Sequence, residues 1–173
     1  MGIYFLRRLG LNAIAISIAS EISNIIVIDV DNTKLDAAIE MGAANTLKSN
    51  SSDALAELLS LTEGSLVAVI DTFGGADTGQ LAVRALVKGG QYLVVGQAGG
   101  DFKMPRVWLP QKAITVHGSH VGNSAQLLKL IDMVRDGKIK QMPIDRRPLS
   151  KINEAIEDLA AGRVTGRVVF QPD

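Results

Sequence analysis

Two residues near the start of the chain have the types and the spacing to bind the hydroxyl groups of a ribose. Gly10 stands at the start of an apolar helical pattern, and Asp29 follows about 20 positions later, directly after the apolar run 25–28. Such a glycine lets the helix pack closely on the preceding strand, and such an acid accepts hydrogen bonds from a ribose. The pair therefore predicts a dinucleotide site. The carboxylate would also repel a 2′-phosphate, which favours NAD over NADP, and Lys34 is placed to reach the same ribose.

The expected elements would place these residues at one edge of a parallel sheet. Apolar residues spaced by three and four predict a helix over 11–22, and short β-branched runs predict strands such as 25–28. Strands alternate with helices along most of the chain, and this alternation indicates βαβ units. We therefore predict an α/β fold, a Rossmann-like doubly wound parallel sheet with helices on both faces. Ligands of such sheets bind at the carboxyl ends of the strands.

Composition excludes several classes of function. Lys plus Arg equals Asp plus Glu at 18 each, so the formal net charge is zero and no nucleic acid partner is expected. The chain has no cysteine, which excludes disulfides, thiolate metal sites and cysteine nucleophiles. No apolar run approaches the roughly 18–20 residues of a membrane span, and the N-terminus does not resemble a secretory signal. We expect a cytoplasmic protein with no membrane partner.

Six runs of sequence, in order along the chain, resemble a known family. They are LGLNAIAI, VIDVDNTKLDAAIEMGAANTL, VIDTFGG, LVKGGQYLVVG, HGSHVGN and PLSKINEAIEDLAAGRVTGRVVF. The chain resembles the C-terminal, NAD-binding half of a zinc-type alcohol dehydrogenase of the medium-chain dehydrogenase/reductase family. The resemblance implies an oxidoreductase domain, hydride transfer between an alcohol and a nicotinamide, and zinc held by a catalytic half that this chain lacks.

The resemblance also implies a domain organisation and a set of binding residues. Residues 1–140 would form the dinucleotide-binding domain, with an atypical first strand and glycine-rich loop, and residues 141–173 resemble the return to the missing catalytic domain. Asp29 is similar to the ribose-binding acid and Lys34 to its basic companion. The other cofactor-binding positions that the resemblance implies are Phe73 and Gly74 beside the adenosine, Val95, Gly96 and Gln97 along the middle of the cofactor and the nicotinamide, Ser119 and Val121 at the carboxamide, and Arg167 at the pyrophosphate.

The first turn departs from the fingerprint G-x-G-x-x-G, which would place glycines at 5, 7 and 10. The sequence has Phe5 and Arg7 there. Phe5 cannot readily adopt a positive φ, and the side chain of Arg7 would stand in the space of the phosphate. The sequence therefore predicts impaired binding of the pyrophosphate of NAD. Two histidines and no cysteine cannot assemble the zinc site of the family, so we expect no metal ligand and no catalytic residue here, and no alcohol oxidation by the isolated chain.

Two alternatives remain at this point. The chain could be a non-enzymatic remnant or interaction domain that keeps the fold, and a homodimer could form through an edge strand near Ile114 and Ser119, because open β-branched edges pair readily. A methyltransferase also combines a glycine-rich first turn with an acid after its second strand. That alternative requires an antiparallel hairpin at the end of the sheet.

Overall fold

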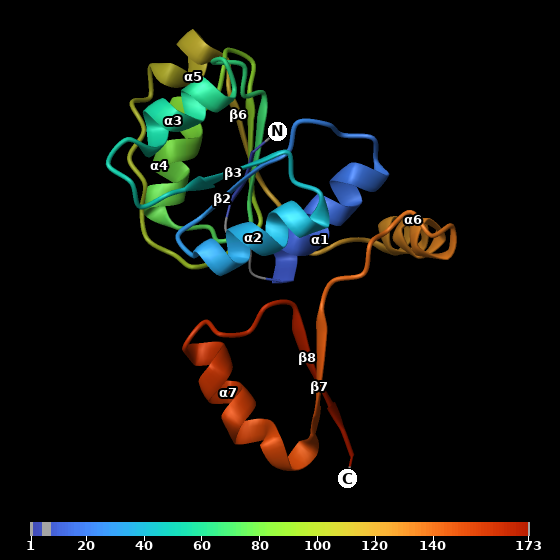
Figure 1. Ribbon diagram of the computed structural model, residues 1–173. Helices are drawn as coiled ribbons and strands as arrows, with labels where there is room; N and C mark the ends of the chain where they lie inside the picture. Colours follow the sequence, from blue (N-terminus) through green and yellow to red (C-terminus); the bar gives the residue numbers. More distant parts are fainter. Residues whose placement is uncertain (1, 5–7, 173) are drawn as a thin grey trace.

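The computed structural model describes residues 2–4 and 8–172 and contains a six-stranded, wholly parallel sheet (Figure 1). Its strand order is β3-β2-β1-β4-β5-β6, the order of doubly wound nucleotide-binding folds. The predicted α/β class and parallel sheet are therefore confirmed. The strands are β1 (Gly2–Tyr4), β2 (Ile26–Asp29), β3 (Asn45–Lys48), β4 (Ala68–Asp71), β5 (Gln91–Val94) and β6 (Thr115–Gly118).

Helices cover both faces of the sheet, as the sequence predicts (Figure 1). Helices α1 and α2 pack on one face, and α3 and α4 pack on the other. Among residues 2–4 and 8–172, no helix combines the length and the apolar character needed to cross a membrane. The helices are α1 (Arg8–Ala19), α2 (Asn32–Met41), α3 (Ala54–Leu61), α4 (Ala76–Ala85), α5 (Trp108–Lys112), α6 (Ser124–Arg135) and α7 (Ile152–Ala160), with a 3-10 turn, η1 (Leu149–Lys151), before α7.

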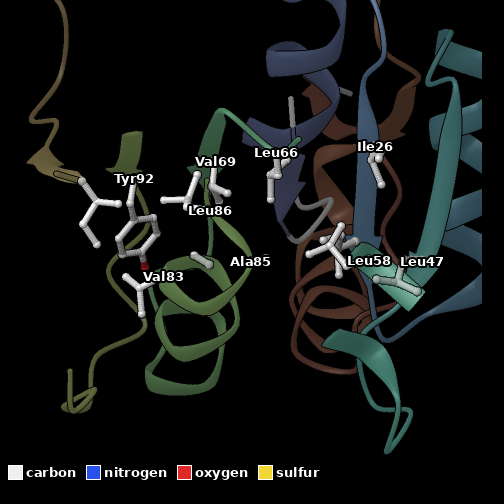
Figure 2. Close-up of a cluster of buried hydrophobic side chains, with 12 residues drawn as sticks. Ile26, Leu47, Leu58, Leu66, Val69, Val83, Ala85, Leu86 and Tyr92 are labelled. Atoms are coloured by element: carbon white, nitrogen blue, oxygen red, sulfur yellow. The ribbon is translucent and has the colours of Figure 1, made fainter. Parts of the chain in front are cut away.

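The continuous apolar run of β2 is explained by burial on both sides. Successive side chains of a strand point to opposite faces. Ile26 and Ile28 enter the core cluster with α3 and α4, where Leu58 and Tyr92 are also buried (Figure 2). Val27 enters the second core cluster, with residues of α1 and α2. A strand buried on both faces has no place for the alternating polar residues of a half-exposed strand.

The end of the chain forms a smaller unit with a sheet of its own. Strands β7 (Ile144–Pro148) and β8 (Arg167–Gln171) pair in parallel and are joined through η1 and α7. This final pair is not the antiparallel hairpin that the methyltransferase alternative requires. The predicted boundary after residue 140 falls in the connection between α6 and β7.

The sequence did not predict β7, because its residues are mostly polar and Pro143 and Pro148 flank or end it, which is typical of a loop. Arg147 on this strand is 20% exposed, and its guanidinium lies 2.7 Å from the carboxylates of both Asp145 and Asp158. Because Asp158 is on α7, the ion pair ties the helix to the strand. The two arginines Arg147 and Arg163 lower the pKa of Asp158 through hydrogen bonds and charge.

The α3–α4 core cluster gives a test of the fold. Leu58 of α3 is 0% exposed, whereas its neighbour Leu59 is 37% exposed. We expect Leu58→Ala to lower the free energy of unfolding by about 2–5 kcal/mol, because it removes buried methyl groups and leaves a cavity. Leu59→Ala is the matched control on the same helix and should cost far less. Urea denaturation of both variants measures the difference, and equal losses would contradict the packing described here.

Candidate functional site

The carboxyl ends of the parallel strands meet at one edge of the sheet, where the sequence predicts the site. Asp29 ends β2 and Asp71 ends β4, with β1 between these two strands. From β1 the sheet continues through β2 to β3, and from β4 it continues in the opposite direction through β5 to β6. A doubly wound sheet has its ligand crevice at this switch point, because the connecting helices leave toward opposite faces there.

The described residues at this edge line two clefts. The first, here called the β3–α4 cleft, has a volume of about 350 Å³ and lies between the segment after β3 and helix α4. Its lining includes Val30, Asn50, Leu55, Thr78, Leu81 and Arg84. The second, here called the C-terminal cleft, has a volume of about 390 Å³ and lies between the main sheet and the C-terminal unit. Its lining is Leu9, Lys34, Thr72, Leu159, Gly162, Val164, Gly166 and Arg167.

The C-terminal cleft brings together Lys34 and Arg167, two predicted cofactor-binding residues from distant parts of the chain. Lys34 lies in the first turn of α2, and its ammonium is 3.5 Å from the carboxylate of Asp31. Arg167 begins β8 and is exposed. Leu9 in the first turn of α1 contributes to the same cleft. Two cations beside the positive end of a helix dipole favour an anionic ligand.

Asp29 is more deeply buried than the sequence suggests. It is 1% exposed, and its Oδ1 accepts a hydrogen bond of 3.0 Å from the backbone N–H of Asp31. Asp31 in turn caps α2 by accepting from the N–H of Thr33 at 2.9 Å. Asp29 therefore turns the chain from β2 into α2. Its neighbour Val30 lines the β3–α4 cleft and Lys34 lines the C-terminal cleft, so Asp29 lies between the two, and its contact with a ribose stays a prediction.

Asp71 holds together the loops at this edge of the sheet, although no motif in the sequence distinguishes it from other acidic residues. The carboxyl is 0% exposed. Its Oδ1 accepts from the backbone N–H groups of Phe73 at 2.9 Å and Gly74 at 2.7 Å. Its Oδ2 accepts from the hydroxyls of Thr78 at 2.6 Å and Tyr92 at 2.8 Å. Burial, followed by the charge of Asp71 and its hydrogen bond, raises the pKa of Tyr92.

Gly74 and Gly96, both predicted to bind the cofactor, have a packing role in the structure. A Cβ atom on Gly74 would lie 2.0 Å from the carbonyl oxygen of Gly96, and one on Gly96 would lie 2.1 Å from the carbonyl carbon of Phe73. The backbone N–H of Ala98 also donates to the Phe73 carbonyl at 2.9 Å. These glycines therefore let the loops after β4 and β5 touch through their backbones. Any additional contact with a ligand stays a prediction.

The remaining predicted residues lie at the same edge of the sheet, but they are not among the described residues that line either cleft. Gly10 is buried within α1, and Phe73 is half-buried with its ring over Gly75. The other four follow β5 and β6: Val95, Gln97, Ser119 and Val121. Phe5 and Arg7, which the sequence associates with the phosphate, lie outside the described residues.

Val121 has an unusual backbone, with φ at 47° and 83% exposure. A β-branched residue in the left-handed region is strained. A larger groove of about 630 Å³ between α1 and α6 contains none of the predicted site residues, so we place the candidate site at the two edge clefts.

The residues present do not fit the zinc site of a dehydrogenase. Within residues 2–4 and 8–172, no three His, Cys, Asp or Glu side chains gather in a way that could hold a metal ion. Zinc sites in proteins use three or four such ligands, with cysteine and histidine the most common. No step of a reaction is therefore assigned to a metal in this chain.

Fold, strand order and edge clefts together define a Rossmann-type nucleotide-binding domain. Comparison with known proteins agrees with this class and narrows it. The zinc-binding dehydrogenase family matches residues 9–136, which is most of the chain, and the chain belongs to this family.

Named relatives extend the match over nearly the whole chain. An NAD-dependent alcohol dehydrogenase of Sulfurisphaera tokodaii is 33% identical over 166 residues, and one of Saccharolobus solfataricus is 34% identical over 166 residues. In both cases the match covers 94% of this chain and 48% of the relative. The crystal structure of the alcohol dehydrogenase from Aeropyrum pernix superposes with a TM-score of 0.88 at 27% identity, over 99% of this chain and 49% of that one.

The chain spans about half the length of the curated relatives it matches. The resemblance to the nucleotide-binding half of a zinc-type alcohol dehydrogenase is thereby confirmed, and no finding favours the alternative of a non-enzymatic interaction domain. NAD binding, a dimer and a cytoplasmic location stay predictions.

The Asp71–Tyr92 hydrogen bond predicts a distinctive response to alkali. Because the fold raises the pKa of Tyr92 above its ordinary value of 10.0, the folded state holds the phenolic proton more tightly than the unfolded state. The resulting stabilisation is complete below about pH 10 and is lost as the pH rises further. Tyr92→Phe should lower the free energy of unfolding by about 1–3 kcal/mol at neutral pH, because it removes one of the two hydroxyl donors to the buried Oδ2 of Asp71 and leaves Thr78 as the other.

Urea denaturation of the wild type and of Tyr92→Phe at about pH 8 and about pH 11 measures this effect. The difference between the two proteins should shrink at the higher pH, since only the wild type has the Tyr92 proton to lose. If the difference in the free energy of unfolding stayed the same at both pH values, the hydrogen bond to Asp71 would not raise the pKa of Tyr92.

Proposed function

We propose that this chain binds NAD across the two edge clefts and serves as the cofactor-binding half of an NAD-dependent alcohol dehydrogenase. The observation that carries the proposal is the position of the C-terminal cleft. Leu9 follows β1 and Thr72 follows β4, so the cleft opens at the switch point of the sheet. Lys34 and Arg167 line the same cleft and supply positive charge for a pyrophosphate.

The β3–α4 cleft is the place for the adenosine. Val30, Leu55 and Leu81 give it apolar walls for a base, and Asp29 lies at the junction with the C-terminal cleft, where the ribose would sit. Because Asp29 is 1% exposed, contact with the ribose requires a small movement of its neighbours. The backbone turn that Asp71 holds would form the floor beneath the cofactor.

In the proposed enzyme, Lys34 and Arg167 of this chain would hold and orient the dinucleotide, whose nicotinamide would supply the hydride acceptor for the alcohol. The half of the relatives that this chain does not match would supply the zinc and the alcohol site. We therefore infer that the chain alone binds NAD without oxidising alcohols.

Calorimetric titration with NAD tests whether the chain binds this cofactor. The wild type should bind NAD, more weakly than a chain with all three fingerprint glycines, and Arg167→Ala should weaken binding by a further factor of about 10 to 100, the usual effect of losing a hydrogen bond to a charged group. Arg146→Ala is the matched control, since Arg146 is an exposed arginine on the neighbouring strand β7 that does not line the cleft. Absence of binding by the wild type would refute the proposal.

Asp29→Asn tests the choice between NAD and NADP. An asparagine keeps an acceptor for the N–H of Asp31, so the entry into α2 should survive. The loss of the negative charge should lower the affinity for NAD and raise the relative affinity for NADP, because a 2′-phosphate is no longer repelled. An unchanged ratio of the two affinities would show that Asp29 does not face the ribose.

We also propose that two copies pair through β6. This strand is the outer edge of the sheet, and all four of its residues are exposed. The N–H groups of Thr115 and Ser119 donate inward, to the carbonyls of Gly90 just before β5 and of Val94 at its end. The backbone N–H groups of successive residues in a strand point to opposite sides of the strand within the sheet. The N–H of Val116 therefore points to the open edge, where it can donate a hydrogen bond to a second copy.

Val116→Pro removes that outward N–H without removing a bond to β5. We expect the variant to be monomeric in sedimentation velocity experiments at concentrations where the wild type is dimeric. Val116→Thr keeps both the N–H and the β-branched shape, and it serves as the control that should stay dimeric. Equal sedimentation of the wild type and Val116→Pro would refute pairing at this edge.

A further inference from the structure

The connection between the main sheet and the C-terminal unit is fastened to the α1–α2 layer by two consecutive side chains. Ile139 packs against the core cluster of α1 and α2, which includes Leu11 and Leu35. The ammonium of Lys140 donates a hydrogen bond to the backbone carbonyl of Glu40, 100 residues earlier in the chain. We call Ile139 and Lys140 the α2 anchor.

Lys140 occupies a position where a cation is favourable. Glu40 lies in the last turn of α2, where backbone carbonyls lack a helical partner and the helix dipole is negative. The N–H of Gly42 takes the carbonyls of Ala38 and Ile39, and Lys140 takes that of Glu40. The long-range contact therefore adds a third capped carbonyl to the C-terminal turn of α2.

The other end of the same helix faces the C-terminal cleft. Lys34 lies in the first turn of α2 and lines that cleft. A helix is a rigid rod that rises 1.5 Å per residue, so Lys34 and Glu40 are about 9 Å apart along its axis. The C-terminal unit, which carries Arg167 into the cleft, follows directly after the anchored connection (Figure 1). One helix thus links the anchor to the opposite wall of the cleft.

We propose that Ile139 and Lys140 are positioning residues, which hold Arg167 opposite Lys34 and so pre-organise the C-terminal cleft for the pyrophosphate. This inference rests on the proposed function. Without the anchor, the C-terminal unit would sample more orientations, and only a fraction of molecules would present both cations together. The apparent affinity falls in proportion to that fraction.

The first experiment measures position without any ligand. Because the chain has no cysteine, spin labels can be attached at Asp36→Cys on α2 and Glu157→Cys on α7, both exposed positions. Electron–electron double resonance then gives the distribution of distances between the two units. We expect Lys140→Ala to broaden the distribution and Lys140→Arg to restore it. A distribution unchanged by Lys140→Ala would overturn the proposal.

The matched control for charge is Lys138→Ala. Lys138 is exposed, and its ammonium lies 3.2 Å from the carboxylate of Asp136. Its removal changes the net charge by the same amount as the removal of Lys140. We expect it to leave the distance distribution unchanged, and broadening by both variants alike would overturn the specific role of Lys140.

The second experiment measures ligand binding. Lys140→Ala should weaken the binding of NAD about two- to fivefold. This factor corresponds to the usual stabilisation that a cation provides at the C-terminus of a helix. Binding of adenosine, which has no phosphate, should not change. In an Arg167→Ala background, Lys140→Ala should have no further effect on NAD, since the anchor acts through Arg167. An equal loss of NAD and adenosine binding would show general damage and would overturn the positioning role.

The two experiments separate failure of this inference from failure of the proposed function. If the wild type binds neither NAD nor adenosine, the proposed function is refuted, and the distance distributions still decide whether Lys140 positions the C-terminal unit. If the wild type binds NAD and Lys140→Ala changes neither affinity nor distance, the proposed function stands and the anchor is refuted.

Discussion

The buried carboxylate of Asp71 is the interaction on which the carboxyl edge of this sheet depends. A buried charge is costly unless hydrogen bonds compensate it, and here four donors do so: two backbone N–H groups and the hydroxyls of Thr78 and Tyr92. These bonds tie together the end of β4, the start of α4 and strand β5. The turn after β4 is fixed by this network, and with it Thr72 in the wall of the C-terminal cleft.

The fold could be predicted because its signals are local. The alternation of apolar helical and β-branched patterns gave the parallel sheet, and the run 25–28 gave a strand buried on both faces. Strand β7 was missed because its pairing with β8 lies far away in sequence and its residues are mostly polar. Arg147 is held by Asp145 and Asp158 there, a contact that no local pattern reveals.

The candidate site was predictable in its parts but not in its geometry. Lys34 and Arg167 were both chosen from the sequence, and the structure places them in one cleft. The burial of Asp29 was not foreseen, because it depends on how the chain turns to let Asp31 cap α2. Gly74 and Gly96 were assigned to the ligand through the family resemblance, and the sequence alone does not say which group approaches each glycine. Here the partner is the protein's own backbone.

The contact between Gly74 and Gly96 restricts how this protein could change over evolutionary time. When a side chain crowds another side chain, a smaller residue at the second position can relieve the clash. A methyl group on Gly74 would instead meet a carbonyl oxygen at 2.0 Å, and every amino acid carries that oxygen. No second substitution at position 96 can make room, so neither glycine has a compensating partner. Neither glycine can therefore be replaced in the course of evolution unless the loops after β4 and β5 move apart at the same time.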